Sequence, residues 1–198
     1  MGFTRAELEA VRGTVVPDLI GADLRLLFVG INPGLWTAAA QAHFAHPGNR
    51  FYRALHLAGI TRWQIDATSG FRAEDLAELT ARDVGITNLV ERATARADEL
   101  TRPELIAGGE ALAAKVGLWR PAVVAVVGLT AYRSAFGRPK ATIGPQDELL
   151  AGAQVWALPN PSGLNAHHDA RSLATLYRAA AEAAHVPLDP PPVPTGRG

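Results

Sequence analysis

A near-continuous apolar run, Ala122–Gly128, constrains the fold of this chain more than any other stretch. It consists of valine and alanine up to its final glycine, so a strand formed there has no face suited to water. Strands buried on both faces are typical of parallel sheets that helices cover on both sides. Leu26–Gly30 is a second run of this kind. Since helical patterns stand between such runs, the sequence predicts an α/β fold, a three-layer α/β/α sandwich around a mainly parallel sheet.

The other elements follow from periodicity, capping signals and turn residues. A capping box from Thr4 to Glu7 predicts a short peripheral N-terminal helix within residues 1–20. The predicted strands are 24–29, 85–90, 122–128 and 154–158, and the further predicted helices are 49–57, 71–82, 101–116, 131–136 and 168–184. We expect a single domain, 1–186, followed by a Pro-rich tail, 187–198, which we expect to be disordered.

The charged residues are balanced, with 19 basic against 19 acidic side chains. A strongly basic chain would indicate a nucleic-acid partner, so a DNA contact here needs basic residues gathered on one face. Because the sequence has no cysteine, disulfides, thiolate metal sites and a cysteine nucleophile are excluded. No stretch reaches the roughly 20 apolar residues of a membrane span, and the N-terminus has no apolar signal core. We therefore expect a soluble, cytoplasmic protein with no membrane partner.

The first apolar run ends in a turn, Asn32-Pro33-Gly34. Pro33 donates no backbone hydrogen bond and Gly34 permits positive φ, so the strand stops there. Asn32 is thereby placed at the carboxyl end of a strand, where open α/β sheets bind their ligands. For this turn considered alone, a strand ending without chemistry is the better interpretation.

A second turn string, Pro159-Asn160-Pro161-Ser162-Gly163, follows the last predicted strand. Considered alone, it too is a common turn-forming sequence that indicates no function. In a parallel sheet, however, both turns emerge on the same edge and can converge on one ligand. The pairing of the two turns therefore favours a shared site over two unrelated loops.

The two turns and their continuations resemble the mismatch-specific uracil-DNA glycosylases, relatives of thymine-DNA glycosylase. The first motif of that family reads Gly-Ile-Asn-Pro-Gly, as in Gly30–Gly34, and continues here through Ala42–Phe51. Leu158–Leu164 is similar to the DNA-intercalating loop of the family. The resemblance spans about residues 24–177. It implies a uracil-DNA glycosylase-like fold, a monomer and an enzyme without metal or cofactor.

The resemblance also implies an activity. The enzyme would hydrolyse the N-glycosidic bond of uracil mispaired with guanine in double-stranded DNA, initiating base excision repair; ethenocytosine and thymine are further candidate bases. Such chemistry requires the base to leave the duplex stack. Asn32 would position the attacking water, because a carboxamide oxygen accepts hydrogen bonds but scarcely takes a proton. Backbone amides around Ile31 and near Phe44 would stabilise the departing uracil anion. We expect a slow enzyme, weaker than one with an Asp in place of Asn32.

The remaining site assignments also follow from the resemblance. Phe44 would stack on the flipped base, with a core phenylalanine as the alternative, and Thr37 would form a pocket wall. Leu164 would fill the gap left by the flipped nucleotide. The candidate substrate-binding residues are Gly30, Ile31, Thr37, Phe44 and Asn160, and the candidate DNA-binding residues are Pro33, Gly34, His43, Ser162, Gly163, Leu164, Asn165, His167 and Arg171.

Several of these assignments have open alternatives. His43 could equally be a solvated loop histidine. The family often has Ser and Arg after the wedge leucine, whereas this chain has Asn165 and Ala166. His167, His168 and Arg171 could therefore replace the contact that those residues make with the opposite DNA strand. Candidate phosphate contacts, or else ordinary surface charges, are Arg50, Arg53, Arg133, Arg138 and Lys140.

Two other functions remain open at this level. One is a nucleotide-binding α/β domain. The sequence counts against it, because no Gly-rich phosphate loop follows any predicted strand. The other is a DNA-lesion binder without catalysis that uses the same pocket. His43 and His46 are weak evidence for a metal, because no carboxylate stands beside them in the loop.

Overall fold

A five-stranded sheet forms the centre of the computed structural model, which describes residues 2–163 and 167–192. The spatial order of its strands is β2-β1-β3-β5-β4. The first four are parallel to one another, and β4 runs antiparallel to β5 at one edge. The strands are β1 (Leu26–Gly30), β2 (Val84–Asn88), β3 (Val123–Val127), β4 (Gly144–Leu150) and β5 (Ala153–Leu158). The prediction of a mainly parallel sheet is confirmed.

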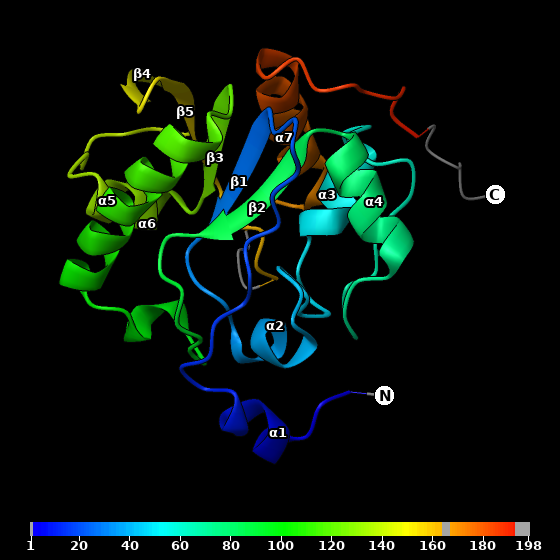
Figure 1. Cartoon of the computed structure of the whole chain (residues 1–198), viewed down its shortest axis with the longest axis vertical. Coiled ribbons are helices and arrows are strands. Elements are labelled where there is room, and N and C mark those ends of the chain that lie inside the picture. The colour runs from blue at the N-terminus through cyan, green and yellow to red at the C-terminus, as the bar shows by residue number, and fades with distance from the viewer. Residues whose placement is uncertain (1, 164–166, 193–198) are drawn as a thin grey trace.

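Helices cover both faces of this sheet, as Figure 1 shows. On one face lie α3 (Phe51–Leu57), α4 (Ala73–Ala81) and α7 (Ala170–Ala183), which share a core with Phe28 and its neighbours. On the other face lie α5 (Arg102–Trp119) and α6 (Leu129–Ala135), which pack on Leu27 and Val29. Successive residues of β1 thus point into different cores, as the period of two along a strand requires. The three-layer α/β/α sandwich is confirmed.

Two short helices lie beyond the carboxyl ends of the parallel strands. They are α2 (Leu35–Ala40), which follows the Asn-Pro-Gly turn, and α1 (Arg5–Ala10). The predicted capping box of α1 is present: the Thr4 hydroxyl accepts from the Glu7 amide, and the Glu7 carboxylate accepts from the Thr4 amide. A 3₁₀ turn, η1 (Ala97–Glu99), lies in the segment between β2 and α5. In the part of the chain that the structure describes, no helix is both long and apolar enough to cross a membrane.

Among the strands, the sequence patterns missed β4, at the edge of the sheet. It begins with Gly and Pro, and most of its residues are exposed, so neither alternation nor an apolar run marks it. Its pairing with β5 is what makes it a strand. The predicted elements agree with those observed to within a few residues at each end, which is the usual uncertainty of helix and strand ends.

The C-terminal segment differs from the expectation. Asp189 donates its backbone N–H to the Gly59 carbonyl at 2.8 Å, and its carboxylate pairs with the buried Arg82. Arg82 also donates to the Pro187 carbonyl at 3.1 Å. The expected disorder therefore does not begin at Pro187, because backbone and ionic partners distant in sequence hold the first part of the tail. Residues 193–198 lie outside the described part of the chain.

Candidate active site

A cavity of about 550 Å³ opens at the carboxyl ends of the parallel strands. Both predicted turns contribute to it: Asn32 and Gly34 from the first, and Asn160, Ser162 and Gly163 from the second. Its size lies in the range of small-molecule pockets. The remaining lining residues are Ile31, Thr37, Phe44, His46, Gly48, Asn49, Asn88, Thr94, Ala95, Ala97 and Val127.

The Asn32 side chain is held by three acceptors. Its Nδ2 donates to the Thr94 hydroxyl at 2.7 Å, to the Arg92 carbonyl at 3.0 Å and to the Pro33 carbonyl at 3.1 Å. Two of these partners are carbonyls, which only accept, and Thr94 Oγ1 gives its own proton to the Arg96 carbonyl at 2.7 Å. The nitrogen of the amide is therefore identified without ambiguity. Oδ1 is left with no donor among the described residues, on a side chain that lines the cavity.

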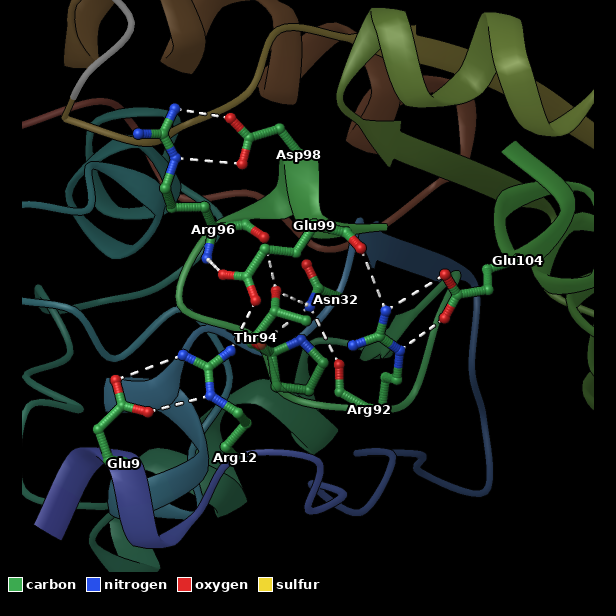
Figure 2. Close-up of polar contacts among 10 residues, drawn as sticks. Glu9, Arg12, Asn32, Arg92, Thr94, Arg96, Asp98, Glu99 and Glu104 are labelled. Carbon is green, nitrogen blue, oxygen red and sulfur yellow. Dashed lines mark hydrogen bonds and ion pairs between the residues drawn. The ribbon is translucent and has the colours of Figure 1, made fainter. Parts of the chain in front are cut away.

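The segment after β2 provides this support for Asn32. The Thr94 amide donates to the Pro33 carbonyl at 3.1 Å, which joins the two segments through their backbones. Arg92 forms an ion pair with Glu104 at the start of α5, and its hydrogen bond, together with those from the amide and hydroxyl of Thr101, lowers the pKa of that carboxyl to about 2. The pair thus stays charged at neutral pH. Figure 2 shows Asn32 at the centre of these contacts.

Phe44 forms an apolar wall of the cavity. Its ring stacks on the fully buried Phe51, with centroids 4.0 Å apart and planes at 25°. Its φ is +54°, an uncommon conformation for a bulky residue, and the buried Tyr52 hydroxyl holds the preceding carbonyl of His43 at 2.7 Å. Phe44 is only half-buried and lines the cavity, so part of its ring faces the open space.

Asn88 brings a second carboxamide to the cavity from the end of β2. Its Nδ2 lies 3.3 Å from His43 Nδ1, and His43 Nε2 lies 2.9 Å from the Pro17 carbonyl. Because that carbonyl can only accept, Nε2 carries the proton and the unprotonated Nδ1 accepts from Asn88. Burial of His43 lowers its pKa, which favours this neutral form. The orientation of the Asn88 amide is thus determined by its neighbour.

These contacts correct two assignments. His43 is 2% exposed and lies behind Asn88, where its side chain cannot reach DNA, so it is neither the predicted DNA contact nor a solvated loop histidine. The second is Pro33, also a candidate DNA contact: it is buried, and its carbonyl accepts from Asn32 and Thr94 within the protein. Gly30 lies beneath Asn88 and Phe44, and a Cβ there would overlap the Asn88 Oδ1. Gly30 therefore shapes the site by having no side chain.

The second turn is held against the segment that precedes α3. Arg50 donates to the carbonyls of Ser162, Gly163 and His168 at 3.3, 3.1 and 2.9 Å. A Cβ on Gly163 would overlap the Gly48 carbonyl, so glycine is required for this close approach. Arg50 thus spans both sides of residues 164–166 instead of standing free for a phosphate. The predicted wedge Leu164 and the predicted contact Asn165 lie outside the described residues.

Comparison with known proteins agrees with this geometry. The sequence profile of the uracil DNA glycosylase superfamily matches residues 17–183. The chain belongs to the uracil-DNA glycosylase superfamily. The fold is also similar to the solution NMR structure of a candidate uracil DNA glycosylase from Methanosarcina acetivorans, with a TM-score of 0.54 and 16% sequence identity over 86% of this chain and 98% of that one. At this identity the likeness shows the fold.

Membership in the superfamily indicates a DNA glycosylase, a hydrolase that acts on DNA. The predicted residues Ile31, Asn32, Gly34, Thr37, Phe44, Asn160, Ser162 and Gly163 all line one cavity of this glycosylase. Sequence reasoning missed Asn88 and Thr94. Asn88 could have been found, because it is a polar residue near the end of a predicted strand. Nothing in the sequence indicates that the Thr94 hydroxyl meets Asn32.

Other basic side chains of the glycosylase lie away from this cavity. The exposed Arg53 and Arg171 line a separate groove of about 800 Å³ between α3 and α7, and the exposed His167 lies just before α7. Arg133 donates to the Ala141 carbonyl at 2.6 and 2.9 Å, and Arg138 pairs with Glu148 at 2.9 Å. Lys140 is exposed in the same loop. Phosphate contacts by these residues, and DNA contacts by His167 and Arg171, stay predictions.

In residues 2–163 and 167–192, no cluster of three or more His, Asp or Glu side chains could hold a metal ion. His43 faces the Pro17 carbonyl, and Nδ1 of His46 accepts from the Gly48 amide at 3.0 Å. The two histidines are thus engaged separately and do not form a pair of ligands.

Proposed function

We propose that this protein is a monofunctional, mismatch-specific DNA glycosylase that removes uracil paired with guanine from double-stranded DNA. The observation that carries the proposal is the orientation of Asn32: its nitrogen is bound by three acceptors, and its oxygen is left at a cavity suited in size to a pyrimidine. A water that donates to this oxygen would be held beside the sugar carbon of a flipped nucleotide. The protein acts as a monomer in this proposal, which is supported by a cavity lined with residues from both turns of one chain.

The reaction is a hydrolysis at C1′ of the deoxyribose. The bond from C1′ to N1 breaks, and its electron pair leaves with the uracil. The oxygen of the held water bonds to C1′, and a proton of that water is released. Asn32 contributes position and not base strength, because its amide scarcely accepts a proton.

Recognition of the base rests on Phe44 and Asn88. The open part of the Phe44 ring offers a stacking surface, which is worth about 1–3 kcal/mol per base. In this proposal the Asn88 amide, whose Nδ2 is oriented by His43, presents its oxygen and its second N–H to the base. Uracil presents a ring N–H beside carbonyl oxygens, which complements this pair, whereas cytosine presents a ring nitrogen that only accepts. We therefore propose that Asn88 favours uracil over cytosine.

The activity is tested directly with a duplex that contains one G·U pair. We expect the protein to release uracil and leave an abasic site, which alkali then converts to a strand break. A control duplex with G·C at the same position should stay intact. Tight binding of the G·U duplex without release of uracil would identify a lesion-binding protein instead and would refute the proposed glycosylase activity.

Replacement of Leu164 by alanine tests the predicted wedge. We expect uracil release from the duplex to fall about tenfold, because an apolar wedge compensates for the unstacking of the flipped base. Release from a single-stranded substrate should change little, since no gap in a helix needs to be filled. Single-turnover rates on the two substrates provide the comparison. Equal losses on both would show that Leu164 does not act as a wedge.

A further inference from the structure

The N-terminal segment, residues 2–16, lies outside the residues that match the superfamily. It carries α1, a six-residue helix without a single buried residue. A helix this short is not stable alone, so its contacts with the rest of the molecule hold it in place. These contacts fall on the two segments that flank the candidate site, α2 and residues 91–99.

The first group of contacts is apolar. The Phe3 ring meets the Trp36 ring of α2 edge-on, with centroids 5.1 Å apart and planes at 73°. Leu8 and Val11 pack on a small core that includes Leu35 and Ala93. This core joins α2 to the segment after β2. The N-terminal segment thus covers the junction from which Thr37 and Thr94 reach the cavity.

The second group of contacts is made by the backbone. Gly13 donates its N–H to the Ala93 carbonyl at 2.9 Å, and Ala93 donates its own N–H to the Thr14 carbonyl at 2.9 Å. Ala93 stands between the two residues that bind the Asn32 amide, Arg92 and Thr94. The N-terminal segment is therefore paired with the backbone at the point that orients Asn32.

The third contact is ionic and extends the same path. Arg12 donates to Glu99 Oε2 at 2.6 Å, while Glu99 Oε1 accepts the backbone N–H of Arg96 at 2.8 Å. The carbonyl of Arg96 in turn accepts the hydroxyl proton of Thr94 at 2.7 Å. Figure 2 shows this path from Arg12 through Glu99 and Thr94 to Asn32.

We infer that residues 2–16 form a positioning element for Asn32, with Arg12 as its positioning residue. The inference rests on the proposed function for its effect on rate. Arg12 does not line the cavity, so it acts only through Glu99, Arg96 and Thr94. The alternative is that Arg12 and Glu99 form an ordinary exposed ion pair, and many such pairs contribute nothing measurable to stability. What distinguishes this one is that the same carboxylate also binds the backbone of the segment that holds Asn32.

The test compares variants of Arg12 with a control in the same N-terminal segment. We expect Arg12→Ala to lower the single-turnover rate of uracil release at saturating protein by about two- to fivefold, because an exposed ion pair biases the loop by no more than this. Affinity for the duplex and the melting temperature should stay close to those of the unchanged protein. Arg12→Lys should restore the rate, since it can keep the single contact with Glu99. Arg5→Ala removes the same charge from residues 2–16, at a position in α1, and should have no effect.

A double variant identifies the path. Thr94→Val removes the hydroxyl that receives the Asn32 amide and keeps the shape of the side chain. If Arg12 acts through Thr94, the rate of the double variant should equal that of Thr94→Val alone. If instead the rate losses of the two single variants multiply in the double variant, Arg12 does not act through Thr94. Equal rates in Arg12→Ala, Arg5→Ala and the unchanged protein would overturn the positioning role.

A spectroscopic readout separates this inference from the proposed activity. The side-chain amide protons of Asn32 should exchange with water faster in Arg12→Ala than in Arg5→Ala, as measured by NMR on nitrogen-labelled protein. This readout needs no substrate. A protein without uracil release but with faster exchange would refute the proposed function and keep the positioning role. Unchanged exchange in an active enzyme would refute the positioning role alone.

Discussion

Asn32→Ala is expected to lower the single-turnover rate of uracil release from a G·U duplex by about 100- to 1000-fold, the range for loss of a preorganised group that acts in the transition state. The variant loses the oxygen that holds the water, while the cavity and its other lining residues remain. Affinity for the duplex should change little, because the amide is bound to protein groups through its nitrogen and makes no predicted contact with the DNA backbone. Rates at saturating protein and binding to an uncleavable analogue measure the two effects separately.

Asn32→Asp provides an informative comparison. A carboxylate cannot donate to the carbonyls of Arg92 and Pro33, so two of the three contacts that hold the side chain become repulsive. We therefore expect the aspartate variant to be slower than the unchanged protein, even though an aspartate is the stronger base. The contacts of Asn32 thus revise the expectation from the sequence that an aspartate at this position gives the faster enzyme. An alanine variant with full activity would remove Asn32 from the mechanism.

Asn88→Ala is expected to lower uracil release by about tenfold to 100-fold, since truncation leaves the polar edge of the base without its partner. His43 would also lose the donor to its Nδ1, and it should keep its bond to the Pro17 carbonyl. The matched variant is His43→Phe, which keeps an aromatic ring and removes the acceptor that orients the Asn88 amide. We expect this variant to retain more of the uracil activity and to discriminate less between uracil and cytosine.

The measurement is the ratio of single-turnover rates on G·U and G·C duplexes for the three proteins. The rate loss should be largest in Asn88→Ala, and the loss of discrimination should appear in both variants. If Asn88→Ala releases uracil as fast as the unchanged protein, Asn88 does not read the base.

The outline of the fold followed from local patterns. Ala122–Gly128 and Leu26–Gly30 predict strands buried on both faces, and the helical patterns between such runs predict their covering layers. Because parallel strands end at one edge, the turns after β1 and β5 had to meet, and they line one cavity. These properties depend on spacing along the chain, so the sequence alone was sufficient for them.

Only the tertiary structure decided what the side chains at that edge contact. His43 is buried behind Asn88, Arg50 binds the carbonyls on either side of residues 164–166, and Thr94 holds Asn32, all through partners distant in the sequence. A hydrogen bond requires an approach within a few tenths of an ångström of its ideal length, and no local pattern specifies such an approach between distant segments. The residue types predicted a carboxamide at a strand end; packing determined which atom of that amide is left for the substrate.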